Sequence, residues 1–387
     1  MASTVTQEDS NEVEKRDPSE IKPVIHDAYI KEVVAGLYGM NVTKFTELNS
    51  YDDKNYHIHV DRKFDNPNID VVSDTGYVLK ILNSGDSKNP AIIEGQHKLL
   101  LHLHGKSLPV QLPVSNISGG TWSLEEVSDP DNFECVNGPY VVHMLTYVDG
   151  DIFANKPFYP STLYKLGMFA GKVHKAFKGY EDDYVRNKAK GFIWSLPEVQ
   201  GLTDYTIAIN DSENLDLVKK VIAEYVKDVI PKYGQLSEGY MHGDMNEQNI
   251  LVKDTESDKS SCDVIAFIDY MDAQYSYIVF DVAIMIAYLS IESVDTDQID
   301  VGGHILAGYL TEKTLNTVEI EVIRLCICGR LIQTLVLGAY SFYKNPTNTY
   351  VLQTSKRGWP LLKKIWNISN AELLCRWEVI IESYKNK

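Results

Sequence analysis

The residues best suited to do chemistry lie in one short stretch, residues 242–249, which reads HGDMNEQN. Asp244 is on a loop, and Asn249 follows five residues later. An apolar strand comes next, and a second apolar strand, residues 264–268, ends at Asp269. A hairpin made of these two strands brings Asn249 and Asp269 to the same end, beside the loop that carries Asp244.

Two carboxylates and an amide that converge on one point suit phosphoryl transfer. Asp244 would orient an attacking hydroxyl and accept its proton. Asp269 and the amide oxygen of Asn249 would hold Mg²⁺ against the phosphates. From average residue usage, H-G-D-x4-N arises by chance in about one in a thousand chains of this length. A surface turn with an unrelated Asp and Asn is therefore a poor alternative.

A cation for the phosphates is offered by Lys80, which interrupts the apolar strand at residues 77–82. Glu94 follows on an early turn of the next helix, and a strand lysine paired with such an acid is the protein-kinase arrangement. The alternative is a lysine at an exposed sheet edge with a solvated Glu94. Neither a Walker A sequence nor G-x-G-x-x-G occurs, so the turn at residues 49–55 is the candidate phosphate cover. Its backbone N–H groups and the Ser50 hydroxyl could meet phosphate oxygens.

The elements that must position these residues form two groups. Residues 25–146 read as mostly antiparallel sheet, with an early amphipathic helix at 25–37 and strands near 45–48, 56–60, 77–82, 110–114 and 140–145. One well-marked helix begins at Asn89 as N-cap and ends before Gly105.

Residues 147–387 read as helices at 160–177, 215–230, 280–291, 303–310, 319–343 and the C-terminal end, with a hairpin region at 239–277. We therefore predict an α+β, bilobal fold with a β-rich N-lobe over residues 25–146 and a helical C-lobe over residues 147–387. A polar, acidic tail over residues 1–24 is expected to be disordered.

The net charge and the absence of targeting signals limit the classes of partner to expect. The 387 residues carry 37 Lys and Arg against 54 Asp and Glu, a net charge of −17, which repels nucleic acid and anionic membrane surfaces. No apolar run approaches the ~18 residues that span a bilayer, and the N-terminus has no apolar signal region. The five cysteines are scattered and form no CxxC pair. We expect a cytoplasmic protein with reduced thiols and a small-molecule substrate.

Other polar residues have ordinary interpretations. Asp281 reads by default as the N-cap of an apolar helix, although it could instead accept N–H bonds from the loop of Asp244 and so be structural. Histidines 57, 59, 97, 102 and 104 have loose metal-like spacing, but no cysteine or carboxylate completes a set, so surface histidines are the better interpretation. Cys326 and Cys328 point in different directions on one helix, which favours packing.

Lys80, Glu94, the H-G-D-x4-N stretch and Ile268-Asp269 together resemble the aminoglycoside phosphotransferase and choline kinase-like superfamily. Within it, three stretches look most similar to the hydroxylysine kinases. They are SYDDKNY at residues 50–56, HGDMNEQNILV at residues 242–252 and YSYIVFDVAI at residues 275–284. The resemblance spans about residues 25–387.

The resemblance implies a protein-kinase-like fold and a kinase that uses Mg²⁺ and either ATP or GTP. It makes Asp244 the catalytic base and Asn249 and Asp269 the metal ligands. Lys80 would bind the α- and β-phosphates, and the nucleotide base would be lined by Val142, His143, Met144 and Leu145. The sequence departs from the superfamily at Met271, where glycine is usual, and a positive φ there would be strained.

For the acceptor, the resemblance favours 5-hydroxy-L-lysine, whose side-chain amine needs an acid near Asp244. The candidate acids are Glu247 and Asp272, which could instead be solvated or bind a second metal. Choline, an aminoglycoside or another amino alcohol remains an alternative acceptor on the same fold. A pseudokinase that binds nucleotide without turnover is a different class of function, and the intact trio of Asp244, Asn249 and Asp269 argues against it.

Overall fold

The computed structural model describes residues 22–129, 132–256, 258–344, 346 and 351–385. They form two compact units. The first runs up to Gly105 and includes Val110–Asp149, and the second comprises Lys106–Pro109 and the chain from Gly150 onward. The first unit is rich in strands and the second in helices, so the predicted α+β class is confirmed.

The tail predicted over residues 1–24 lies outside the described residues as far as residue 21. The next three residues contradict it, because Pro23 is buried and the Lys22 ammonium donates to the Ser50 carbonyl oxygen over 2.8 Å. Residues 22–24 therefore belong to the folded first unit.

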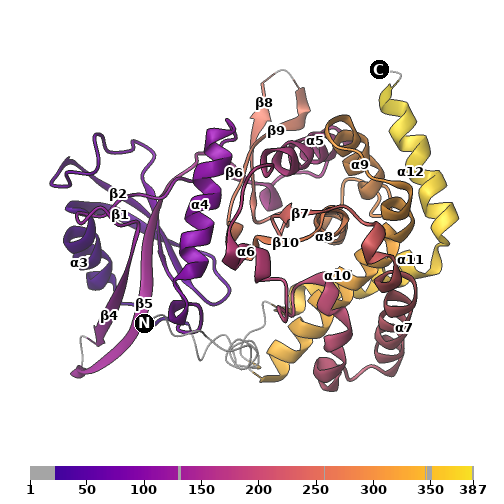
Figure 1. Ribbon diagram of the computed structural model, residues 1–387, viewed down its shortest axis with the longest axis horizontal. Coiled ribbons are helices and arrows are strands. Elements are labelled where there is room, and N and C mark those ends of the chain that lie inside the picture. The colour runs from indigo at the N-terminus through magenta and orange to yellow at the C-terminus, as the bar shows by residue number, and fades with distance from the viewer. Residues whose placement is uncertain (1–21, 130–131, 257, 345, 347–350, 386–387) are drawn as a thin grey trace. The chain divides into compact units, whose positions relative to one another are not determined.

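A five-stranded antiparallel sheet forms the first unit, in the order β1-β2-β3-β5-β4. Two helices accompany it (Figure 1). The elements are α3 (Asp27–Tyr38), β1 (Met40–Leu48), β2 (Lys54–Phe64), β3 (Tyr77–Ile81), α4 (Ala91–Gly105), β4 (Trp122–Asp129) and β5 (Asn132–Thr146).

The two faces of this sheet have different neighbours. Leu79 of β3 and its register partner Met144 of β5 belong to a hydrophobic core that also contains Ile30 and Val34 of α3. Because side chains alternate along a strand, Lys80 points to the opposite face. Its register partner there is His143, which contacts His97 of α4. Lys80 is thus placed in a central strand, on the face that carries α4.

One predicted strand is wrong and another was missed. Residues 110–114 make only an isolated bridge, between Pro113 and Leu145. Proline has no N–H group to donate to a ladder, which limits pairing there. The fifth strand of the sheet is instead β4, whose alternation of apolar and polar residues is weak.

The second unit is built around two buried helices, α8 (Ile278–Glu292) and α10 (Thr317–Lys344), which pack against each other. Helices α7 (Ser212–Asp228) and α11 (Val351–Asn367) also pack against α10 (Figure 1). The remaining helices are α5 (Pro160–Ala176), α6 (Asp183–Asn187), α9 (Val301–Glu312) and α12 (Asn370–Lys385).

Small sheets complete the second unit. One has two antiparallel strands, β7 (Glu238–Met241) and β10 (Gln274–Tyr277). The other has the order β6-β8-β9 and consists of β6 (Asp151–Ile152), β8 (Ile250–Thr255) and β9 (Asp258–Phe267). The loop that bears Asp244 connects β7 to β8, so both sheets hold its ends.

Helix α10 bears on the expectation that no segment is long and apolar enough to span a bilayer. It is 28 residues long, and its most apolar window has a mean hydropathy of 1.7, enough by length and composition to cross a bilayer. That window is 78% buried within the protein, as in the core helix of a soluble domain. The helix is therefore weak evidence for a membrane segment.

Candidate active site

The hairpin of β8 and β9 brings two predicted metal ligands together. Ile250 pairs with Phe267 in its register, and the Ile268 N–H donates to the Asn249 carbonyl oxygen over 2.9 Å. Asp269 follows Ile268 directly, so Asn249 and Asp269 lie at the same end of the hairpin. The predicted convergence is confirmed, while the ligand roles stay predictions.

Asp281 fixes the start of the loop that bears Asp244. Its carboxylate accepts N–H bonds from His242 over 2.8 Å and from Gly243 over 2.9 Å. His174 Nε2 lies 2.9 Å from the same carboxylate, and its Nδ1 lies 2.9 Å from the Tyr309 hydroxyl oxygen. Full burial of Asp281 opposes its ionisation, but the His174 hydrogen bond helps to hold its pKa below the ordinary value.

Asp281 is therefore structural, as one of the two interpretations held. The other, an N-cap, is wrong: Asp281 lies inside the first turn of α8, whose N-cap position is Tyr277.

His242 and Gly243 shape the loop just before Asp244. His242 Nε2 lies 3.0 Å from the Ile268 carbonyl oxygen, and its Nδ1 lies 3.3 Å from the Asp244 backbone nitrogen. Because the carbonyl can only accept and the N–H can only donate, the ring carries its proton on Nε2. Gly243 has φ +87°, and a Cβ atom there would lie 2.2 Å from the Asp272 carbonyl oxygen. The loop geometry thus requires glycine at position 243.

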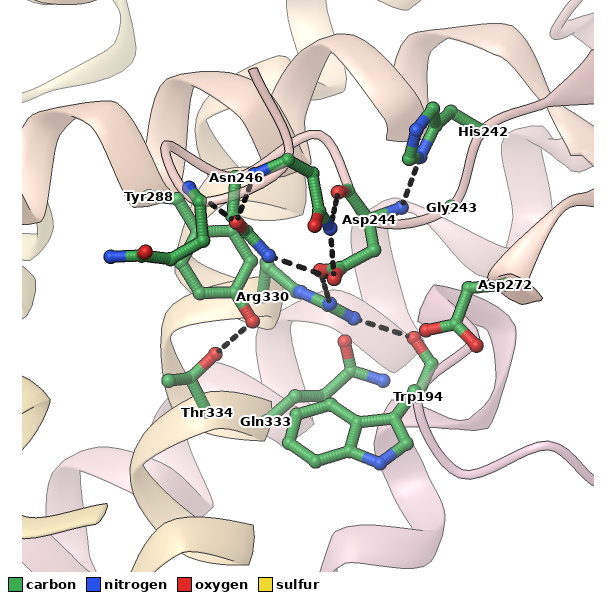
Figure 2. Close-up of polar contacts among 12 residues, drawn as sticks. Trp194, His242, Gly243, Asp244, Asn246, Asp272, Tyr288, Arg330, Gln333 and Thr334 are labelled. Atoms are coloured by element: carbon green, nitrogen blue, oxygen red, sulfur yellow. Dashed lines mark hydrogen bonds and ion pairs between the residues drawn. The ribbon is translucent and has the colours of Figure 1, made fainter. Parts of the chain in front are cut away.

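Three donors hold the carboxylate of Asp244 (Figure 2). Oδ2 accepts from Asn246 Nδ2 over 2.7 Å and from Asn249 Nδ2 over 2.9 Å. Oδ1 accepts from Arg330 Nη2 over 3.2 Å. The side chain keeps 24% of its surface exposed, so a substrate can reach it. Burial raises the pKa of Asp244 to about 6, against the opposing charge of Arg330.

Arg330 was not predicted from the sequence. It comes from α10, its side chain is 2% exposed, and its Nη1 donates to the Trp194 carbonyl oxygen over 2.8 Å. Its guanidinium carbon lies 5.2 Å from the Trp194 ring centroid and 5.1 Å from that of Tyr288. A signal was present, because a lone arginine within the apolar run LCICGRLIQTLVL needs a buried partner.

The residues at the hairpin end fit a divalent metal that is shared with phosphates. Asn249 Nδ2 donates to the carbonyl oxygen and to a carboxylate oxygen of Asp244. The Oδ1 atom of Asn249 is therefore the one that could face a cation. One amide oxygen and the Asp269 carboxylate are hard donors, and Mg²⁺ commonly combines one or two protein ligands with phosphate oxygens. Within the described part of the chain, no group of three His, Cys, Asp or Glu side chains could hold a metal alone.

The concern about Met271 is wrong. Met271 lies in a 3₁₀ helix, Tyr270–Asp272, and its φ is not positive. The left-handed residue is Asp269 instead, with φ +59°. Aspartate is among the non-glycine residues that tolerate this conformation best, so the departure from the superfamily sequence strains nothing at position 271.

The two candidate acceptor acids have different surroundings. Glu247 Oε2 is buried, and among the described residues it has no hydrogen-bond partner. Burial raises the pKa of Glu247 to about 7, and the charges of Glu292 and Asp244 add to this. Asp272 is 30% exposed, and its Oδ1 lies 3.5 Å from the Lys188 ammonium. Glu247 thus has an unmatched acceptor, whereas Asp272 already faces a cation.

The first unit carries the predicted nucleotide residues. Lys80 is 4% exposed in a central strand, so the alternative of a lysine at an exposed edge is wrong. Glu94 is exposed on the first turn of α4, and its pairing with Lys80 stays a prediction. The Ser50 hydroxyl donates to the Asp53 carbonyl over 2.8 Å and accepts from the Asp53 N–H over 3.0 Å, so it stabilises its own turn.

The residues predicted to line the nucleotide base, Val142, His143, Met144 and Leu145, are all buried in β5. His143 Nδ1 lies 3.0 Å from His97 Nε2, and His97 Nδ1 lies 2.8 Å from the Thr121 hydroxyl. His97 is thus a buried packing residue, whereas a surface position was expected. Cys326 and Cys328 are buried free thiols, which agrees with the packing role predicted for them.

Comparison with known proteins shows the family to which the chain is related. The model of the phosphotransferase enzyme family, APH, matches residues 58–313. The hydroxylysine kinase of Mus musculus is 32% identical over 370 residues, which are 95% of this chain and 96% of that protein. The hydroxylysine kinase of Danio rerio is 32% identical over 363 residues, covering 92% and 96%.

Two solved structures share the fold at low sequence identity. An amicoumacin kinase in complex with AMP-PNP and Ca²⁺ has a TM-score of 0.63 at 17% identity, covering 90% of this chain and 97% of its own. A microcompartment-associated aminopropanol kinase has a TM-score of 0.63 at 15% identity, covering 87% and 97%. The chain therefore belongs to the phosphotransferase enzyme family, and it is a small-molecule kinase, related to the hydroxylysine kinases, that acts on a hydroxyl group.

Proposed function

We propose that this protein is a hydroxylysine kinase, which transfers the terminal phosphate of GTP or ATP to the hydroxyl of 5-hydroxy-L-lysine. The observation that carries the proposal is the 32% identity to hydroxylysine kinases over 95% of the chain, together with a reachable carboxylate in a fixed loop. We place the activity in the cytoplasm, in keeping with the acidic composition and the scattered cysteines.

In the proposed reaction, the oxygen of the acceptor hydroxyl attacks the terminal phosphorus. Asp244 accepts the proton of that hydroxyl. A new O–P bond forms, the bond from that phosphorus to the bridging oxygen breaks, and the nucleoside diphosphate leaves with that oxygen. Asn249 and Asp269 would hold Mg²⁺, which would neutralise charge on the phosphates when bound. Lys80 binds the α- and β-phosphates, with Glu94 as its partner.

The other predicted contacts complete the proposal. The turn that Ser50 stabilises covers the phosphates with its backbone N–H groups, and the β5 segment over residues 142–145 borders the nucleotide base. For the acceptor, Glu247 is the preferred partner of the side-chain ammonium, because its Oε2 is buried without a hydrogen bond among the described residues. Asp272 is the second acid of this site and forms an ion pair with Lys188.

The test is a nucleotide-consumption assay of the purified protein with Mg²⁺ and either ATP or GTP. The acceptors are 5-hydroxy-L-lysine, lysine, choline, an aminopropanol and an aminoglycoside. We expect kcat/KM to be highest for 5-hydroxy-L-lysine, and we expect chelation of Mg²⁺ to abolish turnover. Lysine lacks the hydroxyl and should not be phosphorylated. Mass spectrometry of the product confirms that one phosphate has been added.

The variant Asp244→Asn is the control for the mechanism. It should lower turnover by at least about 10²–10⁴-fold, the usual contribution of general-base catalysis, while nucleotide still binds. A preference for choline or an aminoglycoside would replace the acceptor and leave the kinase assignment standing. Tight nucleotide binding without turnover of any acceptor would instead identify a pseudokinase.

A further inference from the structure

We infer that Arg330 is a positioning residue for this phosphoryl transfer, one that turns Asp244 so that its Oδ1 receives the acceptor hydroxyl. This inference rests on the proposed role of Asp244 as the catalytic base. It adds a residue on α10, 86 positions away in the sequence, that the spacing of the catalytic motif does not include.

The hydrogen bonds of Asp244 leave one place for the acceptor. A carboxylate offers about four lone-pair sites, two on each oxygen. Oδ2 has both of its sites occupied by the amide groups of Asn246 and Asn249. Oδ1 has one site occupied by Arg330 Nη2. The remaining site is on Oδ1, so the position of the Arg330 guanidinium decides where the acceptor hydroxyl docks.

Arg330 is held rigidly enough to set that position. Its Nη1 donates to the Trp194 carbonyl oxygen, and the Trp194 and Tyr288 rings both lie near the guanidinium group (Figure 2). The Tyr288 hydroxyl is in turn held by the Thr334 hydroxyl over 3.1 Å. A planar guanidinium with donors in fixed directions can bridge a carbonyl and a carboxylate at once, which a lysine ammonium cannot do in the same geometry.

Burial requires that the charge of Arg330 be paired. Arg330 is 2% exposed, and a buried charge needs a paired countercharge to be tolerated. Among the described residues the only ion pair of Arg330 is with Asp244. Gln333 lies one turn further along α10 and donates to the Ile193 and Ser195 carbonyl oxygens. The same helix thus fixes both the arginine and the segment that carries Trp194.

The chain offers a matched control in Arg324, which is also on α10. Its Nη1 donates to the Ile365 carbonyl oxygen over 3.3 Å, and its guanidinium carbon lies 5.8 Å from the Trp366 ring centroid. It has the same kinds of neighbours as Arg330 but no bond to Asp244. Arg324→Gln therefore measures what the loss of a packed arginine from this helix does to folding and to general activity.

The experiment compares Arg330→Gln, Arg330→Lys and Arg324→Gln under the assay conditions above, with folding followed by thermal melting. We expect Arg330→Gln to lower kcat about 10²-fold, the effect of misplacing a reacting group by about 1 Å. The KM for nucleotide should stay within about twofold. Arg330→Lys should recover part of the lost kcat, and Arg324→Gln should keep kcat within about twofold of the wild type.

A double variant shows whether Arg330 acts through Asp244. In the Asp244→Asn background, Arg330→Gln should lower the residual single-turnover rate by less than about threefold, because the group that it positions is already disabled. Equal losses in the two backgrounds would mean a structural role and would overturn the inference. If Arg330→Gln does not fold, Arg330→Lys is compared in the wild-type and Asp244→Asn backgrounds instead, and equal losses in the two backgrounds overturn the inference.

The inference and the proposed function fail in different ways. If Asp244→Asn keeps a tenth or more of the wild-type rate, Asp244 is not the base and both fail. If Asp244→Asn is inactive while both Arg330 variants match Arg324→Gln, the proposed function stands and only the inference about Arg330 is overturned.

Discussion

Glu247 is the side chain whose surroundings bear most directly on the choice of acceptor. It lies three residues after Asp244, and its Oε2 is buried without a hydrogen-bond partner among the described residues. A buried acceptor that lacks a donor costs about 1–3 kcal/mol, so such a group calls for an explanation. An ammonium group of the acceptor would satisfy it. The oxygen is closed to solvent in this structure, so the Glu247 side chain would have to turn for an ammonium group to reach it.

The corresponding variant is Glu247→Gln, which keeps the size of the side chain and removes the charge. A charge-assisted hydrogen bond is worth about 1.5–3 kcal/mol, so the KM for 5-hydroxy-L-lysine should rise about ten- to a hundred-fold. The KM for nucleotide should stay nearly unchanged. Glu312→Gln, which breaks an ion pair with Lys175 on the helical unit, is the control and should change neither KM. An unchanged acceptor KM for Glu247→Gln would remove Glu247 from the acceptor site.

Among the site residues, the sequence predicted those whose positions follow from a local motif. Asp244 and Asn249 are five positions apart, and the two strands that follow bring Asp269 back to them. Arg330 and Asn246 were missed for different reasons. Arg330 reaches Asp244 only through the packing of α10, which no spacing encodes, and Asn246 looks like an ordinary turn residue until its amide is seen on Oδ2.

The loop between β7 and β8 carries the proposed catalytic base, and Gly243 is its least replaceable residue. Its φ of +87° is unfavourable for any residue with a Cβ, and that atom would lie 2.2 Å from the Asp272 carbonyl oxygen. The neighbour is backbone, so it cannot rotate away. A substitution would therefore displace the loop from the two N–H bonds that it makes to Asp281.

We expect Gly243→Ala to destabilise the protein by about 1–3 kcal/mol or more, the usual cost of a strained backbone conformation, and to lower kcat about 10²-fold. Gly36→Ala is the matched control. Gly36 is in the interior of α3, and apart from the backbone of its own helix no described residue lies within 4 Å of the Cβ position. Alanine is favoured over glycine in a helix, so this variant should be stabilised by about 0.5–1 kcal/mol. Urea unfolding measures both, and equal stabilities for the two variants would refute the close approach at Gly243.

The elements themselves were predictable wherever the local signals agreed. Helix α4 begins where Asn89 and Pro90 indicate it, and the strand around Lys80 is found as expected. The prediction was wrong at residues 110–114, because this segment meets β5 only at the bridge between Pro113 and Leu145, with backbone hydrogen bonds from Val114 to Met144 and from Thr146 to Leu112, and forms no continuous ladder. Tertiary context decides such cases, which a single strand-like run cannot reveal.

At the scale of the whole molecule, a pair of buried histidines in the first unit contributes to the response to acid. His97 and His143 contact each other on the face of the sheet that carries Lys80. Burial and the Lys80 charge lower the pKa of His97 to about 4, and burial holds the pKa of His143 well below its ordinary value. Both rings are therefore neutral in the folded protein at neutral pH, and no carboxylate among the described residues is a cause of either shift.

The sign of the pH effect follows from these shifts. The unfolded chain binds a proton at His97 near pH 6.5, whereas the folded chain does so only near pH 4. Acid therefore favours the unfolded state, and the contribution of His97 to stability is complete above about pH 6.5 and is lost as the pH falls toward 4. Between pH 7.5 and pH 5, the protein should lose about 2 kcal/mol of unfolding free energy from this residue alone.

Urea unfolding at these two pH values tests this, with His97→Gln and His104→Gln as the compared variants. Glutamine cannot titrate, so His97→Gln should remove about 2 kcal/mol from the difference in unfolding free energy between the two pH values, even if it lowers stability at both. His104 is exposed near the end of the same helix, and His104→Gln should leave the pH difference as it is in the wild type. If both variants keep the wild-type pH difference, His97 titrates normally in the folded protein, and the acid sensitivity of the chain comes from its many carboxylates instead.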